Sequence, residues 1–321
     1  MKNIKIVGAG LTGLIAAHLF PGAEVFEASA KKETSGHKAL LRFRSPAVGD
    51  AVGIPFRSVK VHKAIWDGDN GGFAQPNIQL ANSYSLKCTG KVLARSIWDL
   101  SVVERWIAPD DFIEQLSDNL RDRVHYDSPF DFNACLAGAR PNSTIISTAP
   151  MSTLSKFHSP AFPTPEFAHR SIFVYRMQLA NCDVYQTIYF PNVRTPVYRA
   201  SITGDTLIIE AIDRITQIDI EDIAALFSVA VLPFDNPEYT ETNQRFGKIA
   251  PIDDAWRRNF INTLSSKHSI YSLGRFATWR NILLDDVIHD CAVIKQLIRS
   301  DDYSRALLVE NTFKNQALTQ H

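Results

Sequence analysis

The first 27 residues constrain the fold of this chain more than any other segment. A short apolar strand is expected at residues 4–7. It is followed by a glycine motif, an apolar helix, and a second strand that ends at Glu27. In a βαβ unit of this kind, Gly8 permits a tight turn, Gly10 lets a pyrophosphate approach the backbone, and Gly13 lets the helix pack closely on the sheet. The pattern therefore predicts a dinucleotide site at a helix N-terminus, formed by Gly8, Gly10, Leu11, Thr12, Gly13 and Glu27.

The motif alone leaves the dinucleotide open, because a carboxylate at Glu27 would bind the ribose diol of either NAD or FAD. The motif begins at residue 8, which is common in flavoproteins, and no second GxGxxG follows for a nicotinamide cofactor. FAD is therefore the expected cofactor. Any reductant or oxidant would then have to reach the flavin directly.

Composition narrows the class of protein. The chain has 321 residues, of which 45% are hydrophobic, and its 34 basic residues balance its 34 acidic ones. Length and hydrophobic content predict a large core, and the zero net charge predicts neither a general nucleic-acid coat nor membrane adhesion. Four dispersed cysteines, the absence of a signal peptide and the absence of a long apolar run favour a soluble cytoplasmic protein. No metal-binding spacing of histidines is found, so no metal site is expected.

The order of the expected elements indicates two interleaved domains. We expect an α/β fold with a Rossmann-type, glutathione-reductase-like FAD-binding domain, interleaved with an antiparallel β-sheet substrate domain. The substrate sheet is predicted from β-rich runs at residues 172–179, 184–190, 197–202 and 206–211. The FAD-binding domain is assigned to residues 1–65, 105–155 and 265–300, the substrate or cap domain to 66–104 and 156–264, and a C-terminal tail to 301–321.

A second signature lies near the C-terminus, in residues 272–288. It resembles the flavin-contacting segment of UDP-galactopyranose mutases and, more loosely, of amine oxidases: a strand ends in Gly274-Arg275, an aromatic follows at Trp279, and an acid opens a helix at Asp285. The resemblance implies a backbone contact between Leu284 and the flavin pyrimidine. A helix N-terminus there would stabilise reduced anionic flavin. Leu283 replaces the first acid of the mutase pattern.

The same resemblance implies further FAD contacts between the glycine motif and the substrate sheet. Gly36-His37 takes the place of the usual Gly-Gly pair, at a spacing from Glu27 that is about three residues longer than usual. Contacts with FAD are expected from His37, Leu41 and Arg42. A further contact is expected from Val124, in a short strand that returns to the nucleotide sheet.

Charge and aromatic residues predict an anionic substrate. Residues 36–64 carry six Lys or Arg residues against the single acid Asp50. This asymmetry indicates either a substrate with a phosphate or carboxylate group or a solvated strand face balanced by acids elsewhere. The aromatic residues of the substrate sheet either form core or line a pocket over the flavin. The expected substrate contacts are Arg42, Tyr198, Arg199 and Trp279.

The leading hypothesis is an FAD-dependent oxidoreductase of the amine-oxidase type, in which a C–H next to nitrogen delivers hydride to flavin N5. The run of residues 40–45 and the following 53–56 also resemble small bacteriophage flavoproteins found with thymidine-hypermodification enzymes. That resemblance implies an amino-acid-modified thymidine in DNA as substrate. The alternative is a non-redox mutase of the UDP-galactopyranose type, acting on a nucleotide sugar. The sequence identifies neither a catalytic base nor an oligomeric state.

Overall fold

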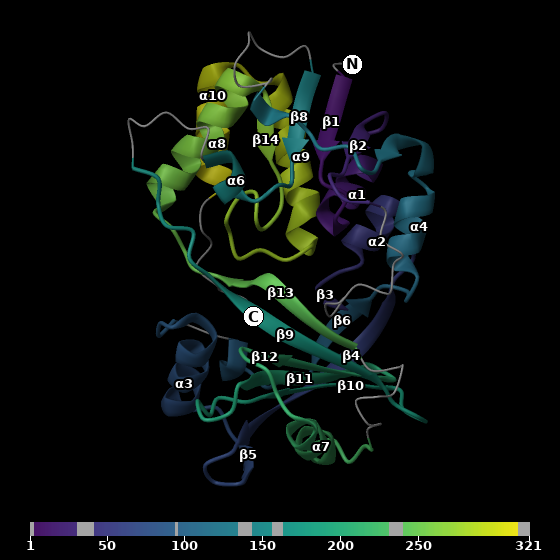
Figure 1. Ribbon diagram of the computed structural model, residues 1–321, viewed down its shortest axis with the longest axis vertical. Coiled ribbons are helices and arrows are strands. Elements are labelled where there is room, and N and C mark those ends of the chain that lie inside the picture. The colour runs from purple at the N-terminus through teal and green to yellow at the C-terminus, as the bar shows by residue number, and fades with distance from the viewer. Residues whose placement is uncertain are drawn as a thin grey trace.

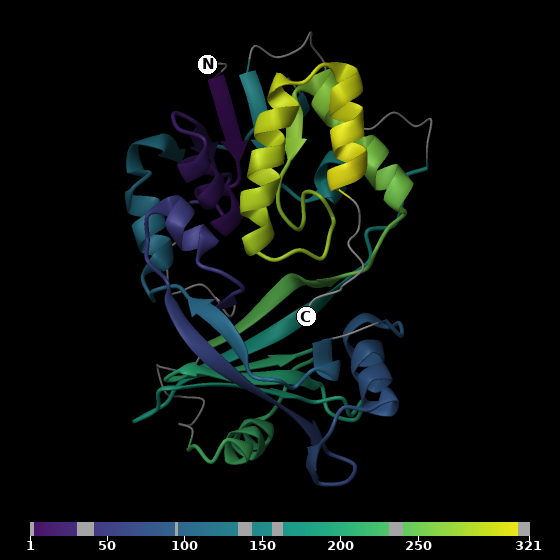
Figure 2. The ribbon, with the colours of Figure 1, turned by 180° about the vertical axis from the view of Figure 1, so that it is seen from behind.

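The computed structural model describes residues 3–30, 42–93, 96–133, 143–155, 163–230 and 240–313. Two sheets dominate it, one above the other in Figure 1. The upper part holds the N-terminal strand and the C-terminal helices, so the two ends of the sequence contribute to one unit (Figures 1 and 2). His37 and Leu41 lie outside the described residues.

The upper sheet has five parallel strands in the order β14-β8-β1-β2-β7. Parallel neighbours need crossover connections. A helix joins β1 to β2, and the chain passes through the lower sheet twice, between β2 and β7 and between β8 and β14. The strands are β1 (Asn3–Val7), β2 (Glu24–Phe26), β7 (Val124–His125), β8 (Ser143–Ser147) and β14 (Ile270–Ser272). Helices α1 (Leu11–Leu19), α2 (Ala47–Val52), α4 (Phe112–Asp118), α6 (Met151–Ser155), α8 (Asp254–His268), α9 (Asp285–Arg299) and α10 (Asp302–Thr312) belong to this part.

The lower sheet has nine strands, in the order β13-β9-β12-β11-β10-β4-β6-β3 with β5 paired to β4. The expectation of a purely antiparallel sheet is corrected in one place, because β10 pairs in parallel with β4. The strands are β3 (Arg42–Phe43), β4 (Arg57–Asp67), β5 (Gly72–Ala74), β6 (Val103–Ile107), β9 (His169–Gln178), β10 (Val184–Tyr189), β11 (Val197–Gly204), β12 (Thr206–Ala211) and β13 (Thr240–Ile249). The described residues also include two 3-10 turns, η1 (Ser96–Trp98) and η2 (Arg121–Arg123).

Each face of the lower sheet has its own apolar cluster. Helix α7 (Gln217–Leu226) packs through Ile220 and Ile223 on one face, and helix α3 (Ile78–Thr89) packs through Leu80 and Tyr84 on the other. This arrangement explains why the strands read as nearly continuous apolar runs, since both of their faces are covered in part.

The boundaries of the two parts differ from the sequence-based ranges. Residues 42–43 and 105–107, expected in the FAD-binding domain, form β3 and part of β6 in the lower sheet. Residues 57–65, expected in the FAD-binding domain, form β4 of the lower sheet, because their side chains complete its core. Residues 254–264, expected in the cap, begin α8, which contacts β14 of the upper sheet. Residues 302–312, expected in a tail, form α10, which packs through Val309 and Phe313 on α8 and α9. Helix α3 and strand β13 were not predicted from the sequence.

A buried lysine fastens α3 to the lower sheet. Lys87 is 4% exposed, and its Nζ donates hydrogen bonds to the carbonyl oxygens of Phe190 (2.8 Å) and Val197 at the ends of β10 and β11. Burial lowers the pKa of Lys87 from 10.5 to about 7. Between pH 7 and 10.5 the unfolded chain therefore binds more protons at this residue than the native protein does.

We predict that Lys87 makes the native state more stable as the pH rises across this window. The free energy of unfolding of the wild type, minus that of Lys87→Met, should increase from pH 7 to pH 10 by up to about 1.4 kcal/mol per pH unit. Urea unfolding at several pH values measures the difference, and Lys60→Met, at an exposed position of β4, is the control. A difference that does not change with pH would contradict the assignment.

Candidate functional site

The glycine motif opens α1 as a bare helix N-terminus. Gly8 adopts a φ of +101°, which favours glycine, and its N–H donates to the carbonyl of Phe26 (2.8 Å). Gly10 is the N-cap of α1 and has no side chain with which to cap the helix. The first-turn N–H groups therefore remain available for an anion, where the helix dipole also favours negative charge.

The three glycines have different steric roles. A Cβ at Gly13 would lie 1.9 Å from the carbonyl oxygen of Gly8, so only glycine allows α1 to pack so closely on the strand end. A Cβ at Gly8 would lie 2.3 Å from Oγ1 of Thr148. A Cβ at Gly10 would meet nothing within 4 Å. Gly10 is thus dispensable for packing, and its bare backbone gives room for a phosphate above the helix end.

Glu27 closes the other side of this turn. Its Oε2 accepts a hydrogen bond from the Ala9 N–H (2.8 Å), and its Oε1 accepts one from the Ser29 N–H (3.0 Å). A carboxylate has about four lone-pair positions, so both oxygens retain capacity for a further donor. Such a pair of acceptors beside the glycine turn fits a ribose diol. Val124 lies on the neighbouring edge strand β7, in register with Val25.

The second signature meets the glycine motif in space. Strand β14 leads into Gly274, whose φ is +89°, and a Cβ on Gly274 would lie 2.7 Å from Cγ2 of Thr12 in α1. The N–H of Leu273 donates to the carbonyl of Ser147 (2.9 Å), which continues the pairing of β14 with β8. Segments separated by more than 260 residues in the sequence therefore form one site.

The start of α9 is tied to a distant strand. Asp285 is part of the first turn of α9, and its Oδ1 accepts a hydrogen bond from the Arg44 N–H (2.8 Å) just after β3. The Arg44 guanidinium pairs with both Asp285 and Asp286. Asp285 thus connects the helix to β3, and Leu284, the N-cap residue of α9, makes no side-chain cap.

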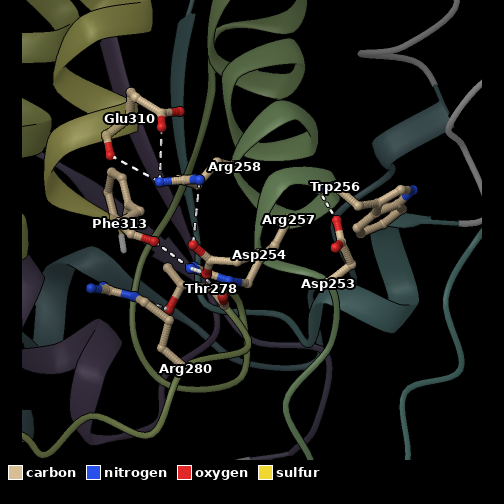
Figure 3. A network of polar contacts seen from close by, with 9 residues as sticks. All are labelled: Asp253, Asp254, Trp256, Arg257, Arg258, Thr278, Arg280, Glu310 and Phe313. Carbon is tan, nitrogen blue, oxygen red and sulfur yellow. Dashed lines mark hydrogen bonds and ion pairs between the residues drawn. The ribbon is translucent and has the colours of Figure 1, made fainter. Parts of the chain in front are cut away.

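A network of buried arginines supports the loop between Gly274 and α9. The Arg257 guanidinium is fully buried and donates to the carbonyl oxygens of Thr278 (3.4 Å) and Phe313. Arg280 donates to Oγ1 of Thr278 (3.1 Å) and pairs with the buried Asp290. Figure 3 shows how Arg257 and Arg258 of α8, Thr278 and Arg280 of the loop, and Phe313 after α10 come together. The C-terminal helix α10 therefore helps to hold the loop in place.

Arg42 is built into the lower sheet. Its guanidinium donates to Oγ1 of Thr187 (2.8 Å), to Oγ1 of Thr203 (2.7 Å) and to the carbonyl of Ile202. Burial and the neighbouring Arg199 lower the pKa of Arg42 to about 9. These bonds give Arg42 a structural role between β3, β10 and β11. Its predicted contacts with FAD and substrate remain predictions.

Two of the other expected substrate contacts are closed off from solvent. Tyr198 is 1% exposed and donates from its hydroxyl to Oε1 of Glu210 (2.9 Å). Trp279 is 1% exposed, and its indole N–H donates to the carbonyl of Ala250 (2.9 Å). Both side chains would have to move to touch a substrate. Arg199 differs, because 31% of its side chain is exposed while it pairs with Glu210.

The basic residues of 36–64 that the structure describes do not gather on one surface. Arg44 pairs with the acids of α9, and Arg57 pairs with Tyr185 and Asp183. Lys63 donates to the carbonyl of Asp99 (2.9 Å), and Lys60 is exposed at the next outward position of β4. The sequence left two explanations for this excess of basic residues: an anionic substrate, or a strand face balanced by acids elsewhere. For Arg44 and Arg57 the second explanation holds, because both pair with acids of other elements.

Two charged residues near Arg199 were not predicted as site residues from the sequence. Glu210 is 8% exposed in the strand Thr206–Ala211. It is the one acid in this largely apolar run, and that isolation was the sequence signal that could have identified it. Lys248 lies on β13, with its Nζ 4.1 Å from the ring centroid of Tyr198. No sequence pattern indicates that Lys248 of β13 reaches the ring of Tyr198 in β11, three strands away in the sheet. Among the described residues, no group of His, Cys, Asp and Glu is arranged to hold a metal ion.

A groove of about 560 Å³ lies on the face of the lower sheet that α7 covers. Residues of α7, the β4–β5 turn and the β10–β11 loop line it, including Trp66, Asp222 and Arg194. None of the predicted site residues belongs to this groove. Within the described ranges, no helix is long and apolar enough to cross a membrane.

No family model matches the sequence, and no curated protein matches it significantly. The fold is similar to that of solved structures. Reduced UDP-galactopyranose mutase aligns over 97% of this chain and 96% of its own, with 14% identity and a TM-score of 0.62. Putrescine oxidase bound to putrescine aligns over 93% of this chain and 99% of its own, with 11% identity and a TM-score of 0.55. A geranylgeranyl bacteriochlorophyll reductase-like protein of Thermoplasma acidophilum aligns over 96% and 82%, with 12% identity and a TM-score of 0.52. The expected α/β architecture, a Rossmann-like parallel sheet interleaved with a second, largely antiparallel sheet, is confirmed.

The steric difference between Gly10 and Gly13 makes a prediction. Gly13→Ala should destabilise the protein by about 1–3 kcal/mol, because its methyl group collides with the Gly8 carbonyl. Gly10→Ala should lower the free energy of unfolding by no more than about 1 kcal/mol, the cost of alanine at an N-cap, yet weaken dinucleotide binding. Denaturant unfolding without cofactor and a binding titration separate the two effects. Equal dinucleotide affinity in Gly10→Ala and the wild type would exclude the proposed phosphate position.

Proposed function

We propose that this chain is an FAD-dependent oxidoreductase. The observation that carries the proposal is the packing of Gly274 against Thr12, which brings the flavin-type segment to the glycine motif. One extended dinucleotide could then contact Glu27 at its adenosine end and the Gly274–Asp285 segment at its ring end. The likeness to putrescine oxidase and to UDP-galactopyranose mutase supports a flavoenzyme.

The residues at this site fit FAD. The bare N-terminus of α1 fits the pyrophosphate, and the two carboxylate oxygens of Glu27 fit the ribose diol. The start of α9 would direct its positive dipole end toward the flavin ring. Asp285 holds that helix end through the Arg44 N–H, so its orientation does not depend on its own cap.

We further propose that the reaction is an oxidation of the amine-oxidase type. Bound FAD supplies a hydride acceptor for a C–H bond next to nitrogen. The chain's own contribution is to hold the substrate and to stabilise charge: the α9 N-terminus favours negative charge on the ring, and Arg199 binds an anionic group of the substrate. The resemblance to phage flavoproteins extends the proposal to an amino-acid-modified thymidine as the substrate.

A mutase acting on a nucleotide sugar is the second candidate. The observation that favours it is the likeness to UDP-galactopyranose mutase over nearly the whole length of both chains. In that case Arg199 would bind the diphosphate, and no net oxidation of substrate would occur.

We predict that the purified protein binds FAD and that Glu27→Ala weakens this binding by about 1.5–3 kcal/mol, the scale of hydrogen bonds to a charged group. Fluorescence titration of the cofactor-free protein with FAD measures the change. Glu24→Gln is a matched control, since Glu24 begins the strand that Glu27 follows, and its Oε1 lies 3.7 Å from Nε2 of His125 instead. Preference for NAD over FAD, or no flavin binding, would refute the cofactor assignment.

The reaction class is tested with the FAD-loaded protein. An oxidase should release peroxide with an amine substrate in air, whereas a mutase should convert a nucleotide sugar only after the flavin is reduced. If the substrate is a nucleotide within DNA, activity should fall steeply with added salt, because phosphate contacts release counterions. A free amine should show little dependence on salt. Turnover of neither substrate class would contradict both candidates.

A further inference from the structure

A β-bulge directs two consecutive side chains of β11 toward one carboxylate. Val197 pairs with Ala211 and Arg199 with Glu210, so two steps along β11 match one step along β12. Consecutive residues of a regular strand point to opposite faces, but here Tyr198 and Arg199 both bond to Glu210. Bulges often re-aim side chains at functional sites.

The carboxylate holds Arg199 from the side. The guanidinium contacts Oε2 of Glu210 through Nε. Within the described part of the chain, its terminal Nη1 and Nη2 atoms form no hydrogen bond or ion pair. Burial disfavours both charges, but each partner more than offsets this effect: the pKa of Arg199 is raised and that of Glu210 is lowered. Both groups therefore stay ionised, and the open end of the guanidinium can bind an anion with two hydrogen bonds.

A second cation reaches the same carboxylate from β13. Its register shifts so that four steps from Gln244 to Lys248 match two steps on β9. Gly247 lies within this irregularity, where a Cβ would collide with Ile172 at 2.4 Å. The result places the Lys248 ammonium over the Tyr198 ring, where it also lowers the pKa of Glu210.

The irregularity in β13 also contacts the segment assigned to the flavin. The Arg275 guanidinium donates to the carbonyl of Gly247 (3.2 Å), and the rings of Phe246 and Phe276 are 5.4 Å apart. Lys248 therefore follows directly after the point where the lower sheet meets the Gly274 turn. Figure 1 shows β13 and β9 along the edge of the lower sheet that faces the upper part.

We propose that Lys248 and Arg199, held around Glu210, form a subsite for a phosphate or diphosphate group, with Glu210 as its positioning residue. The inference rests on the proposed function, since it assigns a substrate class to the same site. Arg199 supplies a planar fork with an open end, and Lys248 supplies a point charge. Because Glu210 and Tyr198 are buried and Arg199 is only partly exposed, the subsite fits a small phosphorylated molecule better than the backbone of a polymer.

The test is calorimetric titration of the FAD-loaded protein with inorganic pyrophosphate at low ionic strength. Loading with FAD keeps the probe away from the α1 N-terminus, and flavin content, measured first, reports separately on the proposed cofactor. The wild type should bind pyrophosphate. Lys248→Met should weaken binding by about tenfold or more, the scale of one charged hydrogen bond. Lys295→Met, which removes an exposed cation of α9, should bind like the wild type.

Glu210→Gln distinguishes positioning from simple charge. Removal of a negative charge by itself would tighten anion binding, whereas loss of the group that orients Arg199 should weaken it by about threefold to tenfold. If Glu210→Gln does not fold, Arg199→Lys replaces it, because it keeps the charge and loses the fork. A twelve-nucleotide single-stranded DNA without terminal phosphate should bind equally to the wild type and Lys248→Met.

The subsite would be overturned if the flavin-loaded wild type did not bind pyrophosphate. It would also be overturned if the affinity for pyrophosphate were unchanged in Lys248→Met or in Arg199→Lys, or if Glu210→Gln bound pyrophosphate more tightly. DNA binding that is weakened in Lys248→Met would overturn the small-molecule assignment. Failure to load FAD would instead count against the proposed cofactor and not against the subsite.

Discussion

The close approach of Gly274 to Thr12 is the contact on which the candidate site depends. A Cβ at Gly274 would lie 2.7 Å from Cγ2 of Thr12, and the φ of +89° at this turn also disfavours any residue with a side chain. The contact exists because β14 pairs with β8 and β8 pairs with β1, which brings residues 270–272 into the same parallel sheet as residues 3–7. Parallel pairing places the carboxyl ends of all three strands at one edge, where ligands bind in open α/β sheets.

The lower sheet depends on a different interaction. In strand order, β3 is three strands from β10 and four from β11, which in a flat sheet would be roughly 14–19 Å at about 4.8 Å per strand. Arg42 nevertheless bonds to both β10 and β11, so the sheet must curl back on itself. The positive charge of the Arg42 guanidinium is stabilised by hydroxyl and carbonyl oxygens of β10 and β11. Since the Arg44 N–H bonds to Asp285, the same short strand also joins the curled sheet to α9.

The two sheets meet where β13 departs from regular geometry. Its irregularity at Gly247 accepts a hydrogen bond from Arg275 and turns Lys248 toward Tyr198. Regular strands would have separated these side chains onto opposite faces. The polar cluster of Tyr198, Arg199, Glu210 and Lys248 is therefore a product of two strand irregularities, and its side chains come from three strands.

The sequence by itself determined the glycine turn between β1 and α1, the alternation of strands and helices around it, and the C-terminal segment that packs against it. These features depend on local chemistry: glycines where a Cβ would collide, a carboxylate at a strand end, and the periodicity of apolar residues. Only the tertiary structure decided the roles of Arg42, Tyr198 and Trp279, and it alone revealed Glu210 and Lys248. The residue type shows that a buried arginine needs hydrogen-bond acceptors or a carboxylate. Which groups serve as these partners depends on the curl of the sheet, on bulges and on pairing between distant strands. Those long-range contacts leave no periodic signal in the chain, which is why β13 and α10 were also missed.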